Sequence, residues 1–163
     1  ALGLHYLCPP MKTRILFVCL GNICRSPAAE EIFRTQVARQ ALSDSIEADS
    51  AGTYSGHAGN LPDPRMRRAA ARRGYELTHR ARPLREADFE RDDNNYETAH
   101  RLAPSRELAG KIHRMAEFCR HSPQWDHVPD PYYEGHEGFE LVLDLLEDAC
   151  EGLLDDLKNP TRS

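Results

Sequence analysis

The chain has 163 residues, of which 40% are hydrophobic and 29% charged, and its formal net charge is −5. These values are typical of one globular domain with a proper core and leave little room for a second. The negative charge argues against nucleic acid or an anionic membrane as the main partner, and no apolar stretch approaches the roughly 18 residues of a membrane span.

The start of the chain and its cysteines narrow the class further. Residues 1–10 lack a basic start, and their apolar patch is too short for a secretory signal. We expect an extension or vector-derived remnant there, with the domain at 11–163. The five cysteines are irregularly spaced, which predicts a reduced, cytoplasmic protein. Cys19 and Cys24 have no second Cys or His pair at zinc-ligand spacing, so no metal site is predicted.

The first predicted elements are a strand and a helix. Residues 13–19, TRILFVC, form a continuous apolar run that suits a strand buried on both faces. Ser26 as N-cap and Pro27 at the first helical position then predict a helix. Its apolar face is formed by Ala29, Phe33, Val37 and Ala41.

The rest of the chain continues the alternation of strands and helices, which predicts an α/β fold. Asp63-Pro64 starts a helix that stops at Gly74. Prolines and a glycine predict a loop at 124–135. The remaining predicted elements are a strand at 45–52, a helix at 94–103, a weak strand at 111–118 and an amphipathic helix at about 136–157.

The loop between the first strand and the first helix has the form Cys-x5-Arg, from Cys19 to Arg25. It enters a helix N-terminus, where backbone N–H groups and the helix dipole favour an anion such as phosphate. Gly21 permits a tight turn, and the Arg25 guanidinium can hold two phosphate oxygens. The expected phosphate-binding residues are Leu20, Gly21, Asn22, Ile23, Cys24 and Ser26.

The same positive field favours a thiolate at Cys19, placed beneath the phosphorus as a nucleophile, and Ser26 can donate a hydrogen bond to it. Cys-x5-Arg alone is a weak signal, and a buried core cysteine is the plain alternative. The strand before the loop and Ser-Pro after it favour the phosphate site. Cys24 is a candidate to protect Cys19 from oxidation by forming a disulfide, or else a small apolar filler.

The segment VCLGNICRSP at 18–27 resembles the phosphate-binding signature of the low-molecular-weight protein tyrosine phosphatases. The resemblance covers most of residues 12–158 and continues in DSAGT at 49–53, PDPRM at 62–66, RRGYELTHRAR at 72–82 and DPYYEG at 130–135. It implies a single-domain three-layer sandwich, with a central parallel sheet of four strands flanked by helices. It also implies a monomer that hydrolyses phosphotyrosine proteins or small aryl phosphates through a phosphocysteine, without metal or cofactor.

The resemblance also implies a role for each site residue. Cys19 is the nucleophile, Arg25 the phosphate clamp and Asp130 the general acid and then base, although an Asp before Pro is also a common turn residue. Tyr132 and Tyr133 line the substrate entrance or simply cover the core. Asn22 and His79 organise the phosphate loop.

Two departures from the family pattern stand out. The aromatic residue usual on one wall of the cleft falls at Gly56, so Tyr54 is the expected substitute, with His57 nearby. An apolar strand expected beside the Cys19 strand is missing between Arg91 and Asp92. Either residues 87–89 form a poor replacement, or the sequence lacks residues of the natural chain. We favour the second alternative, because loss of a central strand would cost more than the whole marginal stability of the protein.

Two rival functions remain. An arsenate reductase on the same scaffold needs cysteines that relay a disulfide, and Cys119 and Cys150 are far apart in sequence. A non-catalytic phosphoprotein-binding module would not need the complete set of Cys19, Arg25 and Asp130. The sequence therefore favours a phosphatase.

Overall fold

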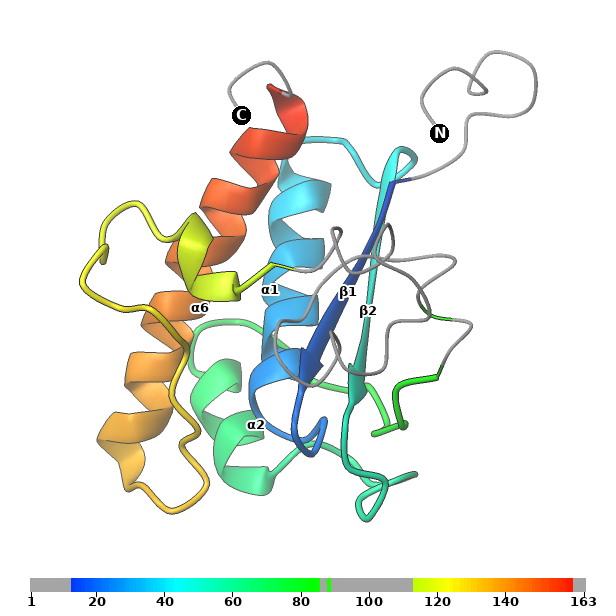
Figure 1. Ribbon diagram of the computed structural model, residues 1–163, viewed down its shortest axis with the longest axis vertical. Helices are drawn as coiled ribbons and strands as arrows, with labels where there is room; N and C mark the ends of the chain where they lie inside the picture. The colour runs from blue at the N-terminus through cyan, green and yellow to red at the C-terminus, as the bar shows by residue number, and fades with distance from the viewer. Residues whose placement is uncertain (1–12, 86–87, 89–112, 160–163) are drawn as a thin grey trace.

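The computed structural model describes residues 13–85, 88 and 113–159, and Figure 1 shows their arrangement. The elements in chain order are β1 (Thr13–Cys19), α1 (Arg25–Arg39), β2 (Ile46–Gly52), α2 (Pro64–Ala71), the 3₁₀ helix η2 (Met115–Phe118) and α6 (His136–Lys158). The predicted α/β class, with a parallel sheet flanked by helices, is confirmed.

Strands β1 and β2 pair in parallel, in a register that runs from Thr13 opposite Ile46 to Cys19 opposite Gly52. Three consecutive β1 residues, Ile15 to Phe17, are buried, as expected for a strand covered on both faces. Gly52 also makes an isolated parallel bridge to Pro83. Because the strands are parallel, both carboxyl ends lie at one edge, where the Cys19 loop begins.

Helix α1 lies between the sheet and α6, and α2 packs against α6 (Figure 1). Phe33 of α1 is fully buried, and its ring meets that of Phe17 edge-on with centroids 5.5 Å apart. The α6 residues Val142, Leu143 and Leu146 complete this core. Burial of these large apolar side chains is the main stabilising contribution, at about 1.5–3 kcal/mol each.

The predicted start of α1 at a Ser26 N-cap is wrong. The helix begins at Arg25 after Cys24, and Ser26 Oγ instead contacts Asn22 and Cys19 within the loop. Pro27 is the third helical residue rather than the first, which is tolerated because N–H groups in the first helical turn have no intrahelical acceptor. Ala41, predicted on the apolar face, lies beyond the helix end with a φ of 56°.

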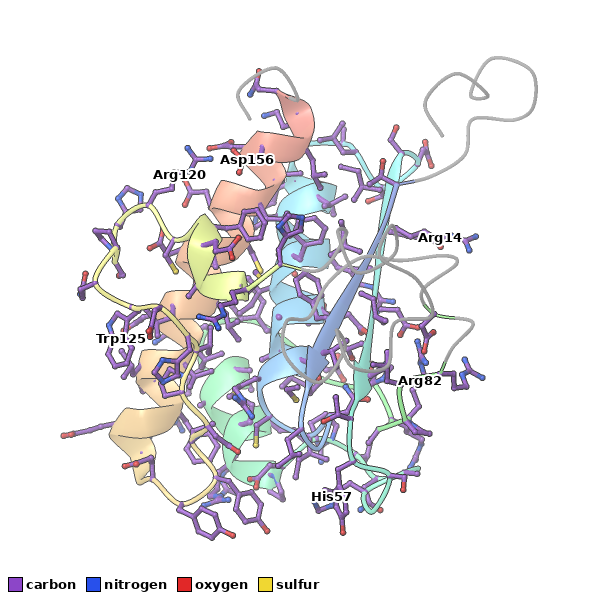
Figure 2. All side chains as sticks on the ribbon, in the orientation of Figure 1. Arg14, His57, Arg82, Arg120, Trp125 and Asp156 are labelled. Carbon is purple, nitrogen blue, oxygen red and sulfur yellow. The ribbon has the colours of Figure 1, made fainter. Side chains whose placement is uncertain are left out.

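The predicted strand at 111–118 is also wrong, because residues 115–118 form η2. Met115 and Phe118 are three residues apart, which places both on one side of a 3₁₀ turn and against the core. Gly152 of α6 permits this packing, since a Cβ there would overlap the Phe118 carbonyl oxygen. Arg120 and Asp156 then pair at 2.5 Å and tie the segment after η2 to α6 (Figure 2).

The described residues contain two of the four expected strands, β1 and β2. The helix predicted at 94–103, the strand expected between Arg91 and Asp92, and residues 1–10 lie outside the described residues. Within the part of the chain that the structure describes, no helix combines the length and the apolar character needed to cross a membrane.

Candidate active site

The predicted catalytic residues lie together in one pocket of about 220 Å³ at the carboxyl end of β1. Cys19 is the last residue of β1 and Arg25 the first of α1, so strand and helix fix the two ends of the loop. The pocket is lined by Cys19, Leu20, Gly21, Ile23, Cys24, Arg25, Tyr54, His57, Asp130, Tyr132 and Tyr133.

Asn22 supports this loop from beneath and does not line the pocket. It is fully buried and has a left-handed backbone with a φ of 55°, which asparagine tolerates better than most residues. Its Nδ2 donates to Ser26 Oγ at 2.7 Å and to Ser50 Oγ at 3.0 Å. Its Oδ1 accepts the backbone N–H of Arg82 at 3.0 Å and lies 3.0 Å from His79 Nε2. Both predicted supports of the loop, Asn22 and His79, therefore meet beneath it.

Ser26 is also a support beneath the pocket. Its Oγ accepts from Asn22 at 2.7 Å. Its single hydroxyl proton has two acceptors within reach, the Ala51 carbonyl oxygen at 3.4 Å and Cys19 Sγ at the shorter distance of 3.1 Å. This is the geometry expected of a hydroxyl that stabilises a thiolate.

Asp130 reaches the pocket from the loop before α6. Its Oδ2 lies 3.4 Å from an Arg25 nitrogen, and its Oδ1 accepts the Tyr132 N–H at 3.1 Å. Arg25 also donates to the Val128 carbonyl at 3.2 Å, which holds the loop against α1. Asp130 can therefore be a turn residue and a site residue at once, because Oδ1 stabilises the turn while Oδ2 faces the Arg25 guanidinium.

Tyr54 provides the aromatic wall that the sequence lacks at Gly56. A Cβ at residue 56 would overlap the Tyr54 ring, so glycine leaves the space that this ring occupies. Tyr54 and His57 meet edge-on with centroids 5.7 Å apart. The sequence did not mark His57 as a site residue, although it lines the pocket (labelled in Figure 2).

Tyr132 and Tyr133 also line the pocket, and Tyr133 is 94% exposed. Arg65 lies 5.3 Å from the centre of the Tyr132 ring, a cation–π distance. Asp63 holds that guanidinium through hydrogen bonds of 3.0 and 2.8 Å. Sequence reasoning missed Arg65, whose only signal was its place in the PDPRM motif.

Three cysteines of the described part of the chain have raised pKa values, which favour the protonated thiol. Burial, followed by the charge of Asp63, raises the pKa of Cys24 to about 12. Burial also raises the pKa of Cys119 to about 11 and that of Cys150 above its usual value. All four described cysteines are free, and Cys24 lines the same pocket as Cys19.

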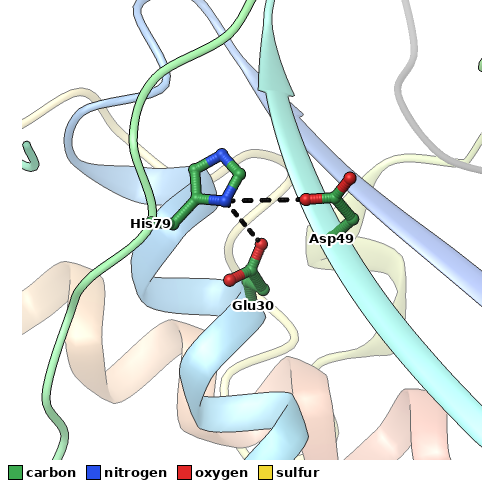
Figure 3. Close-up of side chains that lie close together, drawn as sticks. All are labelled: Glu30, Asp49 and His79. Carbon is green, nitrogen blue, oxygen red and sulfur yellow. Dashed lines mark ion pairs between the residues drawn. The ribbon is translucent and has the colours of Figure 1, made fainter. Parts of the chain in front are cut away.

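His79 meets two carboxylates beneath the phosphate loop (Figure 3). Its Nδ1 lies 3.2 Å from Glu30 Oε1 and 3.5 Å from Asp49 Oδ1. Burial raises the pKa of Glu30 to about 7 although Arg34 opposes the shift, and burial lowers the pKa of His79. Burial acts to raise the pKa of Asp49, but the Ser50 N–H and Arg82 outweigh it and hold that pKa below its usual value.

Comparison with known proteins shows which family has a chain of this kind. A family model described as low molecular weight phosphotyrosine protein phosphatase matches residues 14–163. The chain belongs to this family. The match includes the Cys19 loop and the Asp130 loop.

Relatives from distant organisms support the assignment. A low molecular weight protein-tyrosine-phosphatase of Streptomyces coelicolor is 41% identical over 152 residues, covering 88% of this chain and 93% of the relative. The corresponding phosphatase of Schizosaccharomyces pombe is 39% identical over 150 residues, covering 86% and 94%. The crystal structure of a protein tyrosine phosphatase from Entamoeba histolytica has a TM-score of 0.88 at 40% identity, covering 92% of this chain and 99% of that one.

The Glu30 carboxyl makes the stability of this family member depend on pH. Its pKa rises from 4.5 to about 7 on folding, so the folded protein keeps a proton that the unfolded chain releases. The stabilising contribution is full below about pH 4.5 and is lost as the pH rises through about 7. Glu30→Gln cannot lose this proton. We therefore expect the melting temperature of wild type minus that of Glu30→Gln to fall between about pH 5 and about pH 8.

Differential scanning calorimetry in the presence of EDTA measures this difference. Glu47→Gln is the matched control, since Glu47 pairs with Arg14 at the surface and should give a difference independent of pH. A Glu30→Gln difference that is also constant over this range would contradict the assignment of the proton to Glu30.

Proposed function

We propose that this protein hydrolyses phosphotyrosine in proteins, and small aryl phosphates, through a phosphocysteine intermediate. The observation that carries the proposal is the convergence of Cys19, Arg25 and Asp130 in one pocket at the start of α1. These residues supply a nucleophile, a phosphate clamp and a proton donor. The chemistry they support needs no metal ion.

In the first step, the substrate phosphate binds to the backbone N–H groups of the loop and to the Arg25 guanidinium. The Cys19 thiolate attacks phosphorus as the bond to the phenolic oxygen breaks, and Asp130 donates its proton to that oxygen. The loop amides and Arg25 stabilise the charge on the equatorial oxygens, where preorganised donors are most effective.

In the second step, water attacks the phosphocysteine. Asp130, now ionised, takes a proton from the water, and the Cys19 thiolate leaves. The hydroxyl of Ser26, 3.1 Å from Sγ, stabilises the leaving thiolate. Inorganic phosphate is the product, and the enzyme returns to its starting protonation state.

The walls of the pocket support an aromatic substrate. Four aromatic or imidazole side chains line the pocket: Tyr54, His57, Tyr132 and Tyr133. Aromatic side chains prefer offset or edge-on contacts with another ring, worth about 0.5–1.5 kcal/mol each. The phenyl ring of phosphotyrosine fits between these walls while its phosphate reaches the loop.

The cellular setting completes the proposal. The four cysteines of the described residues, all free, and a net charge of −5 support a cytoplasmic protein that works as a monomer on phosphotyrosine proteins, without nucleic acid or membrane partners. The raised pKa values of Cys119 and Cys150 make them poor attacking thiols. This argues against the arsenate reductase alternative, whose relay needs such thiols.

Replacing the nucleophile or the clamp tests the mechanism. We expect Cys19→Ser and Arg25→Lys each to lower kcat for para-nitrophenyl phosphate by at least about a thousandfold, because each removes a group that acts on phosphorus. Cys119→Ser and Arg120→Lys, remote from the pocket, are matched controls that should retain activity. Circular dichroism verifies folding, and substantial turnover by a folded Cys19→Ser variant would overturn the mechanism.

The role of Asp130 as general acid can be tested with substrates whose leaving groups differ in acidity. We expect Asp130→Asn to slow phenyl phosphate by about 10²–10⁴-fold and activated aryl phosphates much less, because only poor leaving groups need the proton. Asp126→Asn, in the same loop and paired with His127, is the control. Equal slowing across a series of aryl phosphates of increasing phenol acidity would rule out the acid role.

Cys24 has a separate proposed role in redox protection. Peroxide oxidises the Cys19 thiolate to a sulfenic acid, and attack by the Cys24 thiol forms a disulfide and releases water. The two residues line the same pocket, five positions apart in one loop. The disulfide would block further, irreversible oxidation of Cys19.

Recovery from mild peroxide tests this role. We expect dithiothreitol to restore most of the activity of the wild type and a clearly smaller fraction in Cys24→Ala, because the variant oxidises beyond the reversible stage. Cys119→Ser should recover like the wild type. Equal recovery in the wild type and Cys24→Ala would exclude the protective role.

A further inference from the structure

The loop that carries Asp130 has little regular structure to hold it. It joins η2 to α6, and the backbone-to-backbone hydrogen bonds described within 122–135 are local, such as the one from the Glu134 N–H to the Pro131 carbonyl. A general acid must lie within hydrogen-bond reach of the leaving oxygen, and a misplacement of about 1 Å can cost about a hundredfold in rate. The position of Asp130 therefore depends largely on side-chain contacts.

Two arginines contact this loop, one on each side of Asp130. Before it in the chain, Arg25 donates to the Val128 carbonyl oxygen at 3.2 Å. After it, the Tyr132 N–H donates to Asp130 Oδ1 at 3.1 Å, and the Tyr132 ring packs against Arg65. Arg25 lines the pocket, whereas Arg65 is not among the described residues that line it. The contact of Arg65 with the loop is therefore separate from phosphate binding.

The Arg65 guanidinium contacts two aromatic rings. Its central carbon lies 5.3 Å from the centre of the Tyr132 ring and 4.9 Å from that of the Phe139 ring, both within cation–π range. Phe139 lies in the first turn of α6 and is buried in the core. Arg65 itself belongs to α2, which packs against α6 (Figure 1). It thus connects the mostly exposed Asp130 loop to two packed helices.

Asp63 orients Arg65 and joins it to the phosphate loop. Arg65 donates from Nε to Asp63 Oδ1 at 3.0 Å and from Nη2 to Oδ2 at 2.8 Å, a two-pronged contact that a lysine ammonium cannot reproduce. These hydrogen bonds hold the pKa of the Asp63 carboxyl below its usual value, so the pair stays charged at neutral pH. The backbone N–H of Asp63 donates to the Ile23 carbonyl of the phosphate loop at 2.7 Å.

We propose that Arg65 is a positioning residue for the general acid, which it holds at a fixed place relative to the phosphate loop. The inference rests on the proposed function. The contacts run from Ile23 to Asp63, from there to Arg65 and the Tyr132 ring, and from the Tyr132 N–H to Asp130. Arg65 acts through this path without touching the substrate. Its loss impairs proton donation to the leaving oxygen and leaves the nucleophile and the phosphate clamp in place.

The values of kcat/KM for aryl phosphates of different leaving-group acidity test this role, because kcat/KM covers the steps up to phosphoryl transfer to Cys19. Arg65→Met keeps an apolar stem against Phe139 but removes the guanidinium. We expect it to lower kcat/KM for phenyl phosphate at least about tenfold and for para-nitrophenyl phosphate less than about twofold, since only the poor leaving group needs the proton. Arg65→Lys should show the same selectivity, because an ammonium lacks the planar fork.

A double-mutant cycle with Asp130→Asn separates positioning from a general structural effect. If Arg65 acts through Asp130, Arg65→Met should lower kcat/KM for phenyl phosphate less than about twofold further in the Asp130→Asn background, because residues that act through one another are not additive. Arg72→Met is the matched control. It removes another contact of the α2 end with α6, to His136 and Glu140, and should leave kcat/KM for both substrates unchanged.

Melting curves verify that each variant is folded. Asp63→Asn, which keeps an N-cap residue on α2 but loses the charge that holds Arg65, provides the same test if the Arg65 variants do not fold. Equal slowing of both substrates, unchanged kcat/KM for phenyl phosphate, or full additivity with Asp130→Asn would overturn this inference alone. A wild-type protein that hydrolyses neither substrate would overturn the proposed function, and this inference with it.

Discussion

The buried side-chain amide of Asn22 is the interaction on which the site depends. It joins α1 through Ser26, β2 through Ser50, and the segment after α2 through His79 and the Arg82 backbone. Leaving one such buried polar group unpaired costs about 1–3 kcal/mol, so the amide strongly favours a single loop conformation. The left-handed backbone at this residue is stabilised by the same contacts.

In the proposed mechanism one short loop both binds and attacks a phosphate, and this constraint is what prepares the loop for both tasks. The loop amides and Arg25 are positioned before substrate arrives, so little reorganisation is needed during the reaction. His79, which contacts Asn22, is itself held by ion pairs with the carboxylates of Glu30 and Asp49. The charge state of this cluster therefore acts on the loop through the His79–Asn22 hydrogen bond, without touching the substrate.

Local patterns in the sequence predicted much of this architecture. The apolar run of β1, the amphipathic α6 and the Cys19–Arg25 loop depend on neighbouring residues, and the structure agrees with them. Ser26 was misassigned as an N-cap because its hydroxyl bonds to Asn22 and Cys19 rather than to the helix.

Contacts between segments far apart in the sequence could not be predicted from local sequence patterns. The segment at 115–118 became η2 because packing against Gly152 of α6 outweighs its weak strand pattern. The pairing of Arg65 with Tyr132 and the meeting of Glu30 with Asp49 join residues far apart in the chain, which no local period reveals. Tyr54 was anticipated, but the reason it fits, the space left by Gly56, is visible only in three dimensions.

The most direct test of this account is the affinity of the free protein for inorganic phosphate, measured by calorimetry for the wild type and Asn22→Ala. If the buried amide shapes the phosphate loop, the variant should stay folded and bind phosphate at least about tenfold more weakly, a loss of about 1.4 kcal/mol. Asn60→Ala, which alters an exposed asparagine, should bind like the wild type. Equal phosphate affinity in the wild type and a folded Asn22→Ala variant would contradict the account.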